Sequence, residues 1–102
     1  MTRQIDFAGK SGAVYRYTVL EETRMLPPAG ANFVIAKVTA DGADIIYAGQ
    51  TENLSAGAWR DPYEKARSEH GATDILMRLN VRSIVREAEQ DDLIEEHHPP
   101  MN

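Results

Sequence analysis

Two apolar runs joined by an Asp-Gly turn signal constrain the fold of this chain more than any other feature. Residues 32–40 (NFVIAKVTA) begin with a continuous apolar stretch, which is typical of a strand buried on both faces. Asp41-Gly42 predicts a tight turn, and residues 44–48 (DIIYA) predict the returning strand. We therefore expect this hairpin to form the core of an antiparallel sheet.

The residues before this hairpin predict a second one. Residues 13–20 (AVYRYTVL) alternate between two faces and are rich in β-branched and aromatic side chains, as expected of a strand. Residues 3–7 predict a shorter partner strand. Residues 21–31 contain two adjacent prolines and a glycine, and they therefore predict a loop.

The second half of the chain predicts helices around one more strand. A helix is expected from Asp61, an N-cap residue followed by proline, to His70, which a glycine follows. Residues 52–59 predict only a short helix or an irregular turn. Residues 74–79 predict the last strand and residues 81–97 the final helix. The whole is one α+β domain with a small, mainly antiparallel sheet flanked by helices.

Composition excludes several kinds of site. The chain has no cysteine, so disulfides, thiolate zinc sites and cysteine nucleophiles are excluded. No apolar run approaches the roughly 20 residues of a membrane-spanning helix. The first twelve residues lack the apolar core of a secretory signal. We therefore expect a cytoplasmic protein with no membrane partner.

Charge is distributed unevenly along the chain, whose formal net charge is −5. Residues 53–86 carry six Lys/Arg against four Asp/Glu, whereas residues 87–102 carry six acids and neither Lys nor Arg. DNA needs a basic surface, so it would bind the middle segment, with Arg60, Lys65 and Arg67 as the candidate contacts. A solvated surface with an acidic end explains the same pattern.

Glu89 is the first candidate for chemistry. Helical spacing places it in one row between Val85 and Leu93, at the edge of the expected buried face. A buried carboxylate would need a cation, a hydrogen-bond donor or a metal ion as its partner. Spacing alone favours a boundary glutamate whose carboxylate reaches solvent. Val81, Val85 and Ala88 form one apolar stripe, with Ile84 alongside, that is expected to be buried. Leu93 and Ile94 fall off this stripe, so the helix is expected to be either widely buried or bent.

Two aromatic residues are further candidates. Tyr47 lies at a strand end close to Gly49, where a phenol can present its hydroxyl to a ligand, although spacing alone favours a core tyrosine with a wet tip. Trp59 and Arg60 form a weaker candidate that could stack against a nucleotide.

In chain order, these pieces resemble the GIY-YIG endonuclease family. Residues 32–34 stand at the first strand motif and Tyr47-Ala48-Gly49 at the second. Residues 49–54 match the family's "G-x-T-x-N-L" continuation. The remaining matches are Glu69-His70 at a helix end, residues 86–94 as the "A-E-x-x-L-I" helix with Glu89, and residues 99–102 as the terminal "P-x-x-N" with Asn102. The resemblance covers residues 31–102 and makes residues 1–30 an added hairpin and loop of one domain, 1–102.

The resemblance implies a metal-dependent site for phosphodiester hydrolysis. Its residues here would be Tyr47, His70, Glu89 and Asn102. In the family, tyrosines help to activate water, the glutamate holds one divalent cation, and an arginine steadies the phosphate. Mg²⁺ or Mn²⁺ would therefore bind Glu89. The first tyrosine position falls on Phe33 and the arginine position on Gly57, for which Arg60 is the candidate substitute.

Three functional hypotheses follow. The first is a degenerate GIY-YIG-like domain that binds nucleic acid or a protein, with weak or no nuclease activity. The second is an active metal-dependent endonuclease that uses Tyr47, Glu89 and Arg60. The third is an acidic protein-interaction domain. Loss of an arginine clamp costs roughly a thousandfold or more in rate, which favours the first hypothesis.

Overall fold

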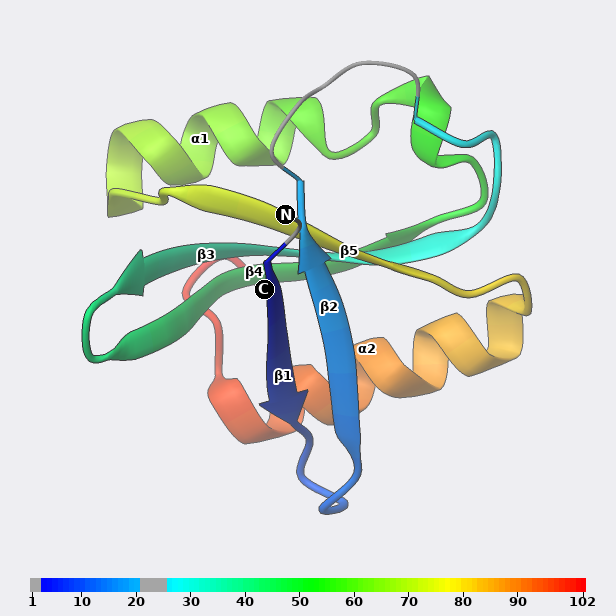
Figure 1. Cartoon of the computed structure of the whole chain (residues 1–102), viewed down its shortest axis with the longest axis horizontal. Helices are drawn as coiled ribbons and strands as arrows, with labels where there is room; N and C mark the ends of the chain where they lie inside the picture. Colours follow the sequence, from blue (N-terminus) through cyan, green and yellow to red (C-terminus); the bar gives the residue numbers. More distant parts are fainter. Residues whose placement is uncertain (1–2, 21–25) are drawn as a thin grey trace.

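A computed structural model describes residues 3–20 and 26–102, so residues 21–25 of the expected loop lie outside the described part (Figure 1). In chain order the elements are β1 (Gln4–Ala8), β2 (Val14–Val19), β3 (Ala31–Thr39), β4 (Gly42–Thr51), the 3-10 helix η1 (Leu54–Ala56), α1 (Arg60–His70), β5 (Asp74–Leu79) and α2 (Ser83–His97). The strands form one sheet in the order β1-β2-β5-β3-β4, and all its neighbours are antiparallel. The expected α+β class is confirmed.

β3 is the central strand of the apolar part of the sheet. It lies between β5 and β4, and residues 31–36 are all buried, which confirms the two-sided position expected from their apolar run. Opposite β3, Ile35 pairs with Tyr47 but Ala36 pairs with Ile45. The skipped residue, Ile46, makes a bulge, and both Ile46 and Tyr47 therefore pack on the same face of the sheet.

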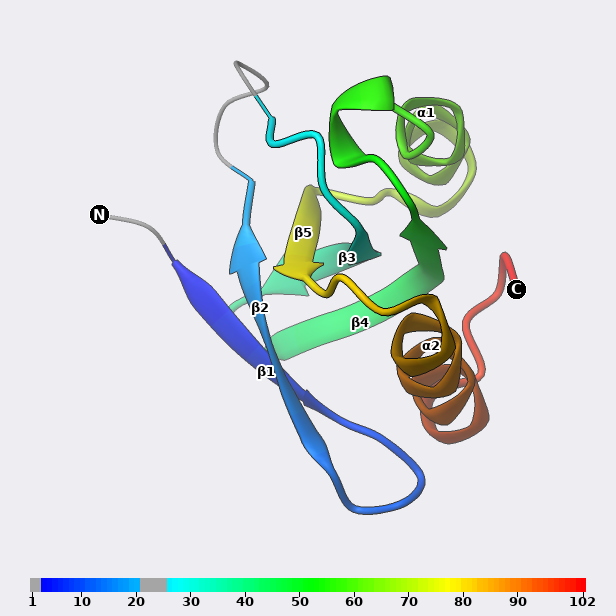
Figure 2. The same ribbon diagram turned by 90° about the vertical axis from the view of Figure 1, so that its right-hand side faces the viewer.

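The two α-helices cover opposite faces of the sheet (Figure 2). The core under α1 contains Ala31, Phe33, Ile35, Ile46, Leu54, Trp59, Ala66, Ala72 and Ile75. The core under α2 contains Phe7, Tyr17, Val19, Val34, Ala36, Ile45, Ala48, Leu76 and Leu93. Alternate residues of β3 enter these two clusters, which is the period-two pattern of a strand.

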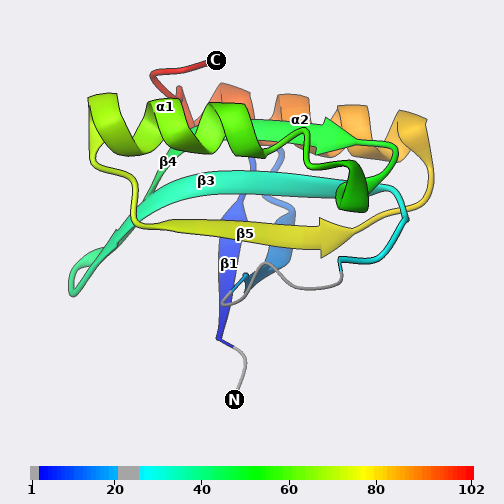
Figure 3. The same ribbon diagram turned by 90° about the horizontal axis from the view of Figure 1, so that it is seen from above.

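The β1–β2 hairpin belongs to the same sheet. It runs steeply across β3 and β5, so the sheet is strongly curled (Figures 1 and 3). β2 joins β5 through the pairs Thr18–Met77 and Val19–Leu76. The hairpin also places Phe7, Tyr17 and Val19 in the core under α2. The N-terminal hairpin is thus a structural part of the core, although the resemblance implied an added segment.

The start of α1 differs from the expected one. The helix begins at Arg60, with Trp59 at the N-cap position and no side-chain cap, so the assignment of Asp61 as N-cap is wrong. Trp59 is buried in the core, and its carbonyl accepts the Tyr63 N–H at 3.0 Å, which starts the helix before the proline. The expected end is confirmed, because Gly71 has φ 71° and donates its backbone N–H to Ala66.

α2 turns a different face to the sheet from the expected one. Its buried residues are Arg86, Glu89 and Leu93, whereas Ile84 is 68% exposed and Ala88 is exposed. Val81, 80% exposed, lies before the helix. The expected apolar stripe is therefore wrong, because Arg86 and Glu89 find polar partners beneath the helix and can be buried.

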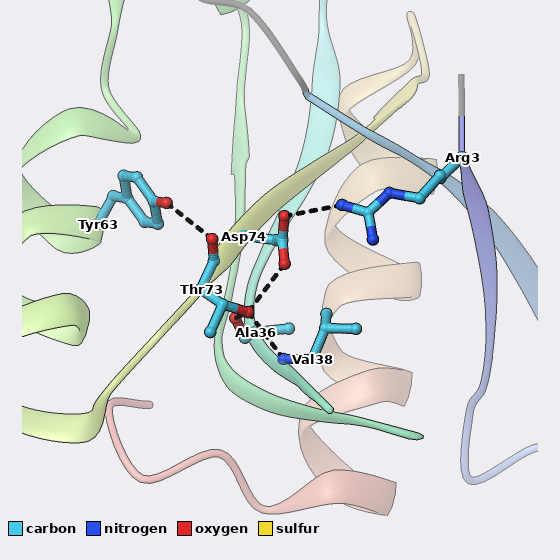
Figure 4. Close-up of polar contacts among 6 residues, drawn as sticks. All are labelled: Arg3, Ala36, Val38, Tyr63, Thr73 and Asp74. Atoms are coloured by element: carbon cyan, nitrogen blue, oxygen red, sulfur yellow. Dashed lines mark hydrogen bonds and ion pairs between the residues drawn. The ribbon is translucent and has the colours of Figure 1, made fainter. Parts of the chain in front are cut away.

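A polar cluster at the start of β5 ties several segments together (Figure 4). Asp74 accepts hydrogen bonds from Arg3 at 3.2 Å and from the Thr73 hydroxyl at 2.8 Å. The Thr73 hydroxyl also accepts a hydrogen bond from the Val38 N–H at 2.8 Å. The backbone carbonyl of Thr73 accepts one from the Tyr63 hydroxyl at 3.2 Å. The cluster joins α1, β3 and the segment before β1 to one end of β5.

Candidate functional site

Tyr47 lies on the α1 face of the sheet, half-buried against Phe33. The two ring centroids are 5.9 Å apart. A Cβ atom on Gly49 would lie 2.6 Å from Phe33 Cζ and 2.9 Å from Tyr47 Cε2, so a side chain there would collide with both rings. The glycine of the Tyr47-Ala48-Gly49 motif is therefore explained by packing. Within residues 3–20 and 26–102 the Tyr47 hydroxyl has no hydrogen-bond partner.

Glu89 is buried and paired with a cation. Its side chain is 11% exposed, and Oε1 accepts a hydrogen bond from Arg78 Nε at 2.9 Å. The expectation that the carboxylate reaches solvent is wrong, and the alternative of a cationic partner is confirmed. The Arg78 guanidinium also lies 5.7 Å from the centre of the Tyr15 ring. Glu89 therefore joins α2 to β5 and to the hairpin side of the molecule.

Tyr47 and Glu89 lie on opposite faces of the sheet. Tyr47 packs against the core under α1. Glu89 projects from α2, which covers the other face (Figure 2). The spacing of the helix motif also differs by one residue from the family pattern. Two residues separate glutamate from leucine in "A-E-x-x-L-I", whereas three separate Glu89 from Leu93, so the pattern position is occupied by Gln90.

Asn102 contacts the strand that carries Tyr47. Its side-chain amide accepts the Ala48 N–H at 2.8 Å and donates to the Ala48 carbonyl at 2.9 Å. The neighbouring Met101 N–H donates a hydrogen bond to the Ile46 carbonyl at 3.1 Å. The C-terminal residues thus pair with the outer edge of β4 on both sides of Tyr47.

Arg60 occupies the space over Gly57, where the family has its arginine. A Cβ atom on Gly57 would lie 2.7 Å from Arg60 Nε. The Arg60 guanidinium also covers the Trp59 ring, 4.7 Å from its centre. Trp59 is 2% exposed, so the expectation that its ring could stack on a nucleotide is wrong.

The three candidate DNA contacts all lie exposed on α1, among an equal number of acids. Arg67 is 3.5 Å from Glu64, with which it forms an ion pair. The charged residues of α1 apart from its terminal histidine are Arg60, Asp61, Glu64, Lys65, Arg67 and Glu69. His70, at the far end of the helix, is roughly 15 Å along the axis from Arg60. Tyr47 and α1, with Arg60 at its start and His70 at its end, therefore lie on one face of the sheet with Asn102 at its edge, whereas Glu89 lies on the other face.

Sequence reasoning missed a second constellation, between α2 and the loop of the β1–β2 hairpin. The Asp92 carboxylate accepts the Ser11 N–H at 2.8 Å, the Ser11 hydroxyl at 2.7 Å and the Tyr15 hydroxyl at 2.7 Å. The hydrogen bond from the Ser11 hydroxyl lowers the pKa of Asp92 most, and the hydrogen bond from the Tyr15 hydroxyl lowers it further. Burial and then the hydrogen bond to Asp92 raise the pKa of Tyr15 to about 12. In the sequence, Asp92 is one acid in a run, and nothing local distinguishes it.

An open groove of about 560 Å³ lies beside this contact. It is lined by Ser11, Tyr15, Ile84, Val85, Ala88, Glu89, Asp91, Asp92 and Glu95. Its walls come from the hairpin and from α2, which are distant in sequence, and the sequence therefore contains no contiguous signal for it.

Comparison of the chain with protein-family models, with curated proteins and with solved structures finds no match. In the described ranges, no helix is both long and apolar enough to cross a membrane. The same ranges contain no group of three or more His, Cys, Asp or Glu side chains arranged to hold a metal ion.

Proposed function

We propose that this chain is a GIY-YIG-like domain that binds another protein and does not cleave nucleic acid. The position of Glu89 carries this proposal. The carboxylate that would hold the metal lies across the sheet from Tyr47. Its Oε1 accepts a hydrogen bond from Arg78 Nε at 2.9 Å. A phosphate and an attacking water at Tyr47 would therefore lie beyond its reach.

The surroundings of Glu89 also do not suit a magnesium ion. Mg²⁺ prefers an octahedral set of oxygen ligands. Glu89 instead faces a guanidinium, and Asp92, one turn further along α2, accepts hydrogen bonds from Ser11 and Tyr15. A cation at Glu89 would have to displace Arg78, which supports a structural role for this carboxylate.

The distribution of charge favours a protein partner over nucleic acid. α2 contains one arginine and six Asp/Glu, and the rest of the chain contains ten Lys/Arg and ten Asp/Glu, so the whole net charge of −5 resides in α2. α1, the candidate DNA surface, has three cations balanced by three carboxylates. A phosphate backbone requires an excess of cations on one surface.

An active nuclease is the second candidate, and Arg60 favours it. Its side chain fills the space over Gly57 and lies on the same face of the sheet as Tyr47. A cation-assisted reaction on this face would depend on these two residues and not on Glu89.

A cleavage assay separates the two candidates. The purified chain is incubated with supercoiled plasmid and with branched DNA, in millimolar Mg²⁺ or Mn²⁺, beside Glu89→Ala, Tyr47→Phe and Arg60→Ala variants. We expect no cleavage by any of them. Cleavage that Glu89→Ala abolishes would overturn the proposal. Cleavage that survives Glu89→Ala but is lost in Tyr47→Phe and Arg60→Ala would establish the second candidate.

A further inference from the structure

We propose that the groove between α2 and the β1–β2 hairpin binds a segment of a partner protein that carries aliphatic side chains at one end and Lys or Arg at the other. This inference rests on the proposed protein-binding function and assigns to it a surface and a class of ligand. The groove contains apolar side chains and unpaired carboxylates in separate places, and together they specify the segment.

The two parts of the groove follow one face of α2. Ile84, Ala88, Asp91 and Glu95 are spaced by four, three and four residues, which places them in one stripe along the helix. The stripe is apolar near the start of α2 and acidic near its end. A bound segment would therefore lie with its apolar residues beside Ile84 and its cations beside Glu95.

The apolar part of the groove is open to solvent. Ile84 is 68% exposed and Val81, three residues earlier, is 80% exposed. Single exposed aliphatic residues are common, but Ile84 lines the groove together with Val85 and Ala88, which makes this end of the groove apolar. Aliphatic side chains of a partner would remove this surface from water.

The acidic part has carboxylates without a cation. Asp91 and Glu95 are exposed and line the groove, and in the described part of the chain neither has an ion-pair partner. The two deeper carboxylates differ, because Glu89 binds Arg78 and Asp92 binds the hairpin loop. The unsatisfied charge therefore faces outward, where Lys or Arg of a partner would pair with it.

The groove is held in place before any partner arrives. The hydrogen bonds of Asp92 to Ser11 and Tyr15, and that of Lys10 N–H to the Asp92 carbonyl at 3.1 Å, fix the hairpin loop against α2. A further contact joins His97 Nε2 to the Ala8 carbonyl at 2.8 Å. A partner would therefore not need to order these two walls on binding.

The test uses a fluorescein-labelled peptide of about 12 residues that carries leucines in one half and lysines in the other half of a single helical face; as a helix it spans the roughly 16 Å from Ile84 to Glu95. The control peptides replace every lysine with glutamate, or every leucine with serine. Fluorescence anisotropy measures binding to the full chain at low and high salt. We expect only the leucine-lysine peptide to bind, and its affinity to fall as salt rises.

Two matched double variants locate the binding. Asp91→Lys with Glu95→Lys alters the groove, and Glu87→Lys with Glu96→Lys makes the same change of charge on exposed residues of α2 outside it. We expect the first pair to weaken binding at least about tenfold, and the second to change it by less than about threefold. Ile84→Ser should also weaken it, and circular dichroism verifies that each variant is folded.

Three results would overturn the groove assignment. These are no binding of the leucine-lysine peptide to the parent chain, equal loss in both double variants, or unchanged binding in Ile84→Ser. The second would show a general attraction to an acidic helix. Each of them leaves the cleavage assay unaffected, so failure of the groove and failure of the proposed non-catalytic function are distinguished.

Discussion

Gly49 connects the sequence motif around Tyr47 to its physical cause. The residue lies opposite Phe33 in the β3–β4 ladder, and its missing side chain leaves room for the rings of Phe33 and Tyr47. A nuclease ancestry and a packing requirement would both place glycine at this position. The structure shows the packing requirement directly.

Gly49→Ala should destabilise the domain by about 1–3 kcal/mol, because the added methyl group overlaps two rings in a close-packed region. Urea unfolding measures this change in the free energy of unfolding. The control is Gly49→Ala in a Phe33→Leu background, where one of the two rings is absent and the alanine should cost less than in the parent. An alanine variant as stable as the parent would contradict this account.

Single residues also show where prediction from sequence ends. The sequence predicted that a buried Glu89 needs a partner, but it did not identify Arg78, because the two meet only when α2 packs across β5. Arg86 was predicted only as part of a basic segment. It is 3% exposed and donates to Gln50 at 2.9 Å and to the Asn80 carbonyl at 2.9 Å. Such pairings depend on tertiary structure.

Among the elements, the strands were more predictable than the helix faces. The β3–β4 hairpin follows from its own apolar pattern and the Asp-Gly turn, since both signals lie within the segment that folds. The orientation of α2 depends on Gln50, Arg78 and Asn80, which lie outside the helix. They form hydrogen bonds with Arg86 and Glu89 of α2, and these two polar side chains can therefore be buried. An amphipathic pattern that counts only apolar residues therefore selected the wrong face.

The contact between the hairpin loop and α2 predicts a dependence of stability on acid pH. The pKa of Asp92 is lower in the folded chain than in the unfolded chain. Its contribution to stability is therefore complete above the unfolded pKa of about 3.9 and is lost as the pH falls through the folded pKa. Asp92→Asn should be less stable than the parent at pH 7, and the two stabilities should converge below about pH 4.

The same contact predicts a loss of stability at alkaline pH. The pKa of Tyr15 rises from 10.0 to about 12 on folding, so its contribution is complete below pH 10 and is lost as the pH rises towards 12. Tyr15→Phe should therefore lose less stability than the parent over this range. Urea unfolding at a series of pH values measures both arms, with Asp91→Asn, an exposed neighbour, as the control. Parallel curves for the parent and the variants would refute this role of the contact.

At the scale of the whole molecule, the curled sheet builds the N-terminal hairpin into the core. Phe7, Tyr17 and Val19 fill the core under α2, and β2 covers the edge of β5. Each such buried side chain contributes about 1.5–3 kcal/mol, against a usual domain stability of about 5–15 kcal/mol. The resemblance to a known family covers residues 31–102, but the physical domain extends beyond this range.

A chain that starts at residue 26 should therefore not fold cooperatively. Its thermal unfolding, followed by circular dichroism, should lack the sharp transition of the full chain, and its amide resonances should be poorly dispersed. The full chain in the same buffer is the control. A sharp transition in the shortened chain would show that residues 31–102 are a self-sufficient unit.

The pairing of the C-terminal residues with β4 has a consequence for self-association. An outer strand with free N–H and C=O groups is a template on which other polypeptides can add strands and grow into fibrils. Met101 and Asn102 occupy the backbone groups of Ile46 and Ala48, so two residues act as a short substitute for a sixth strand. Asn102 thereby covers part of the outer edge of the most apolar hairpin, where another polypeptide would otherwise find free backbone groups.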